Sequence, residues 1–77
     1  MTYEQLLDLL RDMHPEVDFE TADGLIDNKV LTSFDVVSIV AELCETWGVD
    51  VGAVDIVQEN FNSARALFAL VERLENE

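Results

Sequence analysis

The chain has 77 residues, enough for one small domain with a thin core, because a domain of this size buries only about 60% of the surface that its unfolded chain exposes. Seventeen acidic residues face four basic ones, and the formal net charge of −13 disfavours binding to nucleic acid or anionic lipid. Basic protein surfaces or cations are the natural partners, although solubility alone explains such acidity equally well.

Hydrophobic residues make up 49% of the chain and recur periodically, which argues against disorder. Cys44 is the only cysteine, so no internal disulfide can form, and a reducing compartment suits the chain. The first residues lack the basic start and apolar run of a signal peptide, and no apolar run is long enough to span a bilayer. We therefore expect a soluble, cytoplasmic protein without membrane insertion.

The first helix is predicted over residues 3–13. Thr2 and Gln5 have the spacing of a capping box, and Pro15 ends the helix near Met13 or His14. A long connection follows over residues 15–31, and its apolar residues indicate that it packs over the core, with room for a short helical turn. The apolar side of the helix consists of Tyr3, Leu6, Leu7, Leu10 and Met13.

The second helix is predicted over residues 33–47, with Gly48 as the residue that ends it. Phe34 falls on the polar side, beside Ser33, where a solvated helix does not favour a large apolar group. The polar side also holds Asp35, Ser38, Ala41, Glu42 and Glu45. The apolar side consists of Val36, Val37, Ile39, Val40, Leu43, Cys44 and Trp47, so we expect Cys44 to be a buried thiol.

After Gly52 the sequence predicts a short helix at about 53–57 and a last helix at about 63–75, with Asn62 or Ser63 as its N-cap. The apolar stripe of the last helix consists of Ala64, Leu67, Phe68, Val71 and Leu74. No alternating pattern predicts a strand. The fold class is therefore all-α: one domain over residues 1–77, a small bundle of three main helices plus a short third helix.

The sequence gives little support for a catalytic site or a metal site. A calcium-loop pattern started at Asp18 places Asp23 where glycine is needed and Lys29 where the closing glutamate is needed. His14 is the only histidine, and its place beside a proline at a helix end indicates a capping or surface residue. Cys44 has no predicted base beside it. We therefore expect a protein that is not an enzyme and binds no metal.

Ser33 has two interpretations. The first is helix capping, in which Thr32 or Ser33 caps the second helix and Thr32 and Asp35 form a capping box. The second is a modifiable hydroxyl, because free N–H groups and a partial positive charge at a helix N-terminus favour an attached phosphate. The exposed Phe34 supports the second interpretation. So does an acidic strip suited to a basic partner, made of Asp35, Glu42 and Glu45.

Three segments carry a family resemblance: "TSFD" opens the second helix, "WGVDV" follows its end, and "ENFNSARALFALVERL" forms the last segment. In this order and spacing, over about residues 3–75, the chain resembles the acyl carrier proteins. That family holds acyl groups as thioesters on a 4′-phosphopantetheine arm. The resemblance implies that Ser33 is the attachment site of an arm derived from coenzyme A, and that the thiol of the arm, not Cys44, holds the cargo.

The resemblance also implies a set of partner contacts. Phe34 and Asp35 match the motif positions that contact the phosphopantetheinyl transferase and later enzymes, and Glu42 and Glu45 continue that face. Ile56 would be an apolar contact for a partner or the arm. The implied partners are the transferase, an acyl- or aminoacyl-loading ligase, and acyl-accepting enzymes with basic docking surfaces. A monomer is the expected state of such a shuttle.

The chain departs from the family pattern at two positions. Thr32 stands where the residue before the serine is normally aspartate, and Ser38 stands where fatty-acid carriers usually show an acid. Phe34 and "ENFNSARALFALV" look closer to the stand-alone D-alanyl carrier proteins, which accept an aminoacyl group. Two alternatives stay open: an unmodified acidic helical interaction module, and a degenerate carrier that has lost modification because of Thr32.

Overall fold

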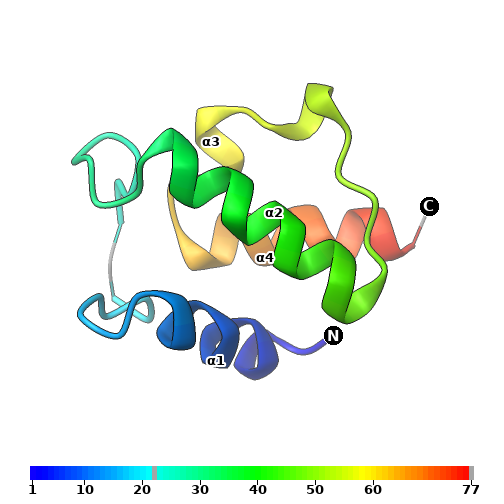
Figure 1. Cartoon of the computed structure of the whole chain (residues 1–77), viewed down its shortest axis with the longest axis horizontal. Helices are drawn as coiled ribbons and strands as arrows, with labels where there is room; N and C mark the ends of the chain where they lie inside the picture. Colours follow the sequence, from blue (N-terminus) through cyan, green and yellow to red (C-terminus); the bar gives the residue numbers. More distant parts are fainter. Residues whose placement is uncertain (22, 77) are drawn as a thin grey trace.

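The computed structural model describes residues 1–21 and 23–76, and in that part of the chain all regular structure is helical. Its elements are α1 (Tyr3–Met13), α2 (Ser33–Trp47), the 3₁₀ turn η1 (Ala53–Asp55), α3 (Gln58–Phe61) and α4 (Ala64–Glu75). Both α1 and α3 pack against α4, and α2 crosses in front of α4 in Figure 1. The predicted all-α bundle is therefore confirmed. No helix in the described residues is long and apolar enough to cross a bilayer.

Local capping chemistry sets where the long helices begin. The Thr2 hydroxyl accepts the Gln5 backbone N–H at 3.2 Å, and the Gln5 side chain accepts the Thr2 N–H at 2.9 Å, which is the predicted capping box. At the start of α4 the Ser63 hydroxyl accepts the Ala66 N–H at 3.1 Å, so Ser63 and not Asn62 is the N-cap. The predicted bounds of α1 and α2 are the observed ones.

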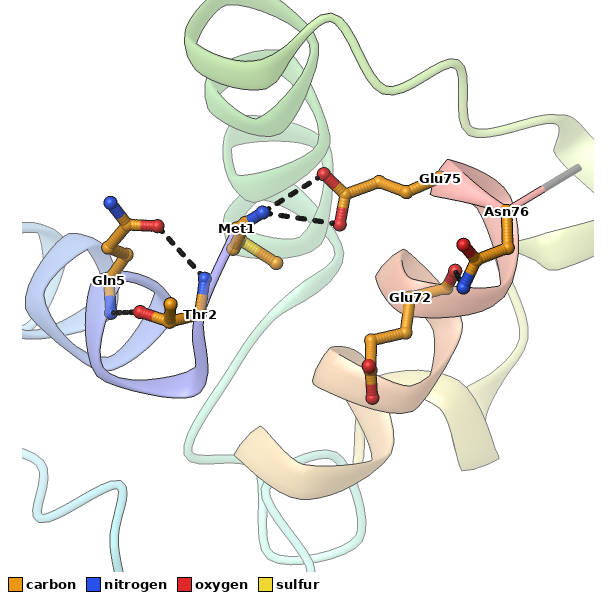
Figure 2. A network of polar contacts seen from close by, with 6 residues as sticks. All are labelled: Met1, Thr2, Gln5, Glu72, Glu75 and Asn76. Atoms are coloured by element: carbon orange, nitrogen blue, oxygen red, sulfur yellow. Dashed lines mark hydrogen bonds and ion pairs between the residues drawn. The ribbon is translucent and has the colours of Figure 1, made fainter.

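The two ends of the described chain lie together. The backbone amino nitrogen of Met1 lies 3.1 Å from a carboxylate oxygen of Glu75, which links the start of α1 to the end of α4 (Figure 2). The Asn76 side chain donates to the Glu72 carbonyl at 2.9 Å and closes the last turn of α4. The contact between Met1 and Glu75 adds a polar tie to the packing of α1 against α4.

The core is continuous and draws on the long connection as well as on the helices. Phe19, Leu25 and Leu31 are buried, so the prediction that residues 15–31 lie over the core is confirmed. Burying one such side chain stabilises the fold by about 1.5–3 kcal/mol. A single α-turn also forms here, closed by the Asn28 N–H donating to the Gly24 carbonyl at 2.8 Å. The helices contribute Leu6, Leu7, Leu10, Val36, Ile39, Leu43, Phe61, Ala64, Leu67, Leu70 and Val71.

The predicted helix at 53–57 is wrong in extent and in number. A 3₁₀ turn covers only Ala53–Asp55, and a separate helix, α3, spans Gln58–Phe61. Val57 between them has extended backbone, with φ −124° and ψ 154°. Val54, Ile56 and Val57 are β-branched residues with weak helix propensity, so the turn does not propagate.

The predicted apolar side of α2 is too wide. Val36, Ile39 and Leu43 are buried, but Val37 is 62% exposed and the Cys44 thiol is exposed rather than buried. Each residue advances about 100° around a helix, which places Val37 and Cys44 at one edge of the apolar arc. The other elements cover only the centre of that arc, so this edge of α2 stays open.

Gly48 ends α2 in the left-handed region, with φ +67°, and no atom lies within 4 Å of a Cβ added there. Gly48→Ala should therefore lower the free energy of unfolding by about 1 kcal/mol through backbone strain alone. Gly52→Ala is the matched control, because its backbone is ordinary and its closest contact to an added Cβ is 3.7 Å. Urea unfolding followed by circular dichroism measures both. Equal stability losses would contradict the strain argument.

Candidate functional site

Ser33 is the first residue of α2 and is exposed. The N-cap is its neighbour: the Thr32 hydroxyl accepts the Asp35 N–H at 3.2 Å, and the Asp35 carboxylate accepts the Thr32 N–H at 2.9 Å. The predicted capping box is therefore present, and Thr32 rather than Ser33 supplies the cap. The hydroxyl of Ser33 is left outside the helix-capping contacts.

Asp35 also ties α2 to the end of α1. Its carboxylate lies 3.1 Å from His14 Nε2, while His14 Nδ1 lies 3.3 Å from Glu16. Both imidazole nitrogens can donate to these carboxylates only when the ring is protonated. His14 caps α1 through its backbone N–H, as the sequence indicated, but its side chain is only 18% exposed and reaches α2. The sequence carries no local signal of that contact.

The pKa of Asp35 lies below its ordinary value. The main cause is the hydrogen bond from the Thr32 backbone N–H, and the Thr32 hydroxyl and the charge of His14 act in the same direction. Partial burial opposes these effects. Of the residues expected to contact partners, Asp35 thus has a carboxylate that is largely engaged within the fold.

A cleft of about 520 Å³ opens beside Ser33. One wall comes from the start of α2 and the opposite wall from the segment that carries η1 and α3, so Ser33 and Ile56 border the same space. In Figure 1 this segment leaves the end of α2 and passes above it to reach α3. The lining is mostly apolar and consists of Ile26, Lys29, Leu31, Thr32, Ser33, Val36, Val37, Ile56, Val57, Gln58 and Phe61.

Large apolar side chains are exposed around this cleft. Val37, Ile56 and Val57 are exposed and line it, and Phe34, next to Ser33, is 77% exposed as its place on the polar side predicted. Single exposed apolar residues need no explanation, but several around one cleft indicate a surface that is covered in use. We call Val37, Ile56, Val57 and Phe34 the apolar rim; the first three line the cleft, and Phe34 adjoins the lining residue Ser33.

Only part of the predicted acidic strip is available to contact a partner. Glu45 is exposed and Glu42 is half-buried, whereas Asp35 is used within the fold. Neither Glu42 nor Glu45 borders the cleft. The strip can therefore attract a basic partner to the outside of α2 without contributing to the cavity itself.

Three of the four basic residues have partners within the described chain. Arg11 pairs with Asp8 and Glu20, and Arg65 lies 4.9 Å from the centre of the Tyr3 ring. Arg73 pairs with Asp55 at 2.8 Å, which fixes η1 against α4.

Lys29 is the basic residue on the wall of the cleft. Its backbone is left-handed, with φ 59°, although it is not a glycine. Within the described residues no group of three or more metal-ligating side chains gathers, at the cleft or elsewhere.

Asp35→Asn should lower the free energy of unfolding by about 1 kcal/mol at pH 7, because it weakens the cap and the contact with His14. A carboxyl group whose pKa is lower in the folded state than in the unfolded state stabilises the fold when it is ionised. This stabilisation is complete above the unfolded pKa of about 3.9 and is lost as the pH falls through the folded pKa. The difference from wild type should therefore shrink below about pH 4. Urea unfolding at a series of pH values tests this, with Glu45→Gln on the same helix as control. A difference that is constant with pH would contradict it.

No model of a known protein family matches this chain, and a search of curated proteins gives no match either. The candidate site consists of an exposed serine at the start of α2, an apolar cleft beside it, and the apolar rim along the cleft.

Proposed function

We propose that this protein is a non-catalytic carrier that holds acyl or aminoacyl groups as thioesters on a 4′-phosphopantetheine arm attached to Ser33. The observation that carries the proposal is the position of Ser33, which is exposed, does not supply the helix cap and borders an apolar cleft. A serine needed only for capping would direct its oxygen to the helix N–H groups, and here Thr32 does that.

The residues around Ser33 fit such a group. The first N–H groups of α2, those of Ser33 and Phe34, have no partner within the helix by helix geometry, so they favour a phosphate at this position. Lys29 adds a positive charge on the wall of the same cleft. The apolar lining offers a surface for the uncharged part of an arm or cargo. When bound, the arm would supply a thiol that forms the thioester, which no residue of this site supplies.

The charge of the surface supports exchange among several partners. A formal charge of −13, with Glu42 and Glu45 on α2, would steer basic enzymes to this face and make their association fast and sensitive to salt. The apolar rim would give each partner a small area to bury. We propose a phosphopantetheinyl transferase, a loading ligase and acyl-accepting enzymes as these partners, met by a cytoplasmic monomer.

The second candidate is an unmodified acidic interaction module, and the third is a carrier that has lost modification. Thr32 is the observation that favours the third, because it lacks the negative charge expected before the serine. The structure gives Thr32 a role of its own, since its hydroxyl caps α2 and lies 3.1 Å from the Asp35 carboxylate. An aspartate there could still accept the N–H but would face another carboxylate.

Intact-mass spectrometry after incubation with coenzyme A and a broad-specificity phosphopantetheinyl transferase tests the carrier proposal. Wild type should gain the mass of one phosphopantetheine group, because the transferase would join the Ser33 oxygen to the arm's phosphorus and release adenosine bisphosphate. Ser33→Ala should gain nothing, and Ser38→Ala, the control on the same helix, should gain the same mass as wild type.

The outcomes separate the three candidates. No gain in wild type together with a gain in Thr32→Asp would identify the degenerate carrier. If neither protein gained mass, the unmodified interaction module would be the remaining candidate. A gain that persists in Ser33→Ala would place the attachment elsewhere and overturn the site.

Glu45→Lys should slow modification roughly 3- to 10-fold at low ionic strength and flatten its salt dependence, because it reverses a charge on the proposed docking face. Glu72→Lys makes the same change in net charge on the exposed surface of α4 and should change the rate little. The rate is measured by mass spectrometry at several salt concentrations. Equal effects of the two variants would show that net charge, not a docking face on α2, governs the encounter.

A further inference from the structure

Asn62 joins α3 to α4 and makes its polar contacts with a distant part of the chain. Its Oδ1 accepts the backbone N–H of Ile26 at 2.9 Å and that of Asp27 at 3.3 Å. Its Nδ2 donates to the Asp27 carboxylate at 3.0 Å, and its backbone carbonyl accepts the Leu25 N–H at 2.8 Å. Since Ser63 caps α4, the side chain of Asn62 is left free for these contacts.

The contacted segment, residues 25–31, leads directly to the start of α2, and we call it the cleft loop. The Leu31 N–H donates to the Leu25 carbonyl at 3.0 Å, and the Lys29 N–H donates to the Ile26 carbonyl at 3.0 Å, so the loop is closed on itself. Leu25 and Leu31 are 2% and 4% exposed, which anchors both of its ends in the core. Leu31 is followed by the cap residue Thr32.

The cleft loop and α3 are also joined by the Asp27 carboxylate, which accepts from the Gln58 side chain as well as from Asn62. Ile26, Lys29 and Leu31 of the loop line the cleft together with Gln58 and Phe61 of α3. A continuous chain of hydrogen bonds therefore runs from the α3–α4 junction, through the cleft loop, to the residue before the α2 cap.

We propose that Asn62 is a positioning residue for Ser33: by holding the cleft loop, it fixes the start of α2 and the wall of the cleft in the arrangement that the modifying enzyme requires. This inference rests on the proposed function. Asn62 does not border the cleft and is not on the proposed docking face, so it would act through the cleft loop and not by contact with the arm or a partner.

The contact between Asn62 and Asp27 can be tested by exchanging the two side chains, which restores the contact without changing the net charge. Asn62→Asp places two carboxylates at hydrogen-bond distance, because the Asn62 nitrogen now 3.0 Å from Asp27 becomes an oxygen. Adding Asp27→Asn exchanges the two groups, so an amide again donates to a carboxylate and the acceptors for the two backbone N–H groups remain. The double variant keeps the formal charge of −13, so electrostatic steering toward the enzyme is unchanged.

Modification rates are measured well below the unfolding temperature, where a residue needed only for stability would leave the rate unchanged. Asn62→Asp should lower kcat about 10-fold with little change in KM, because the hydroxyl is misplaced while the docking face is intact. The double variant should return to within about 2-fold of wild type, as expected for a coupled pair. Asn76→Ala, which loses an asparagine bond at the far end of α4, should match wild type.

A second readout reports on the loop itself. Amide hydrogen exchange at Leu25, Ile26 and Leu31 should speed up in Asn62→Asp and recover in the double variant, because these N–H groups carry the loop's hydrogen bonds. Should Asn62→Asp fail to fold, Asp27→Ala takes its place. It removes the carboxylate but keeps the hydrogen bonds of Asn62 to the backbone N–H groups of residues 25, 26 and 27, and about a 3-fold loss of kcat is expected.

The outcomes distinguish this inference from the proposal on which it rests. If wild type is not modified, the carrier proposal falls and the positioning role falls with it. If wild type is modified and Asn62→Asp reacts as fast as Asn76→Ala, the positioning role alone is overturned. A slow Asn62→Asp variant that the second substitution does not restore would also overturn it, since the effect would then not pass through Asp27.

Discussion

The rest of the site depends on the capping box at the start of α2, which pairs the N–H of Asp35 with the hydroxyl of Thr32. Thr32 and Asp35 cap each other across the first turn, and Asp35 continues to His14 at the end of α1. Because these two residues form the capping box, the side chains of Ser33 and Phe34, which lie between them, are not needed for capping. Ser33 can then face solvent and the cleft without loss of helix stability.

The thin core explains why a cleft lies beside that serine. With few residues available, the segment after Gly48 crosses from the end of α2 to α3 mostly as extended chain and a single 3₁₀ turn. Such a segment covers one edge of α2 incompletely, so Val37 of α2 stays exposed, and Ile56 and Val57 of the segment itself are exposed beside it in the apolar rim. This arrangement leaves some apolar side chains exposed to water in the free protein. It leaves apolar surface in the place where a covalent group and its enzymes would meet the chain.

The parts of the fold that depend on neighbours in sequence were predictable. Thr2, Pro15 and Gly48 mark helix ends by their own chemistry, and Thr32 or Ser33 marked the start of α2, so the bounds of α1 and α2 could be predicted. A four-residue helix such as α3 is too short to show an apolar periodicity in the sequence. The width of the buried arc on α2 depends on which elements pack against it, and for this reason Cys44 was wrongly predicted to be buried. The bonds of His14 to Asp35 and of Asn62 to the cleft loop join distant positions, and no local pattern marks either one.

The exposure of Cys44 has a practical consequence for the chemistry of thiol reagents on this protein. A reagent that alkylates accessible sulfur would react with the unmodified chain at that one cysteine, because it lies at the open edge of α2. An arm ending in its own thiol would add a second reactive sulfur, and loading that arm as a thioester would remove it again. The number of titratable sulfurs would thus report the arm's state, and replacing Cys44 by serine would leave the arm's sulfur as the only signal.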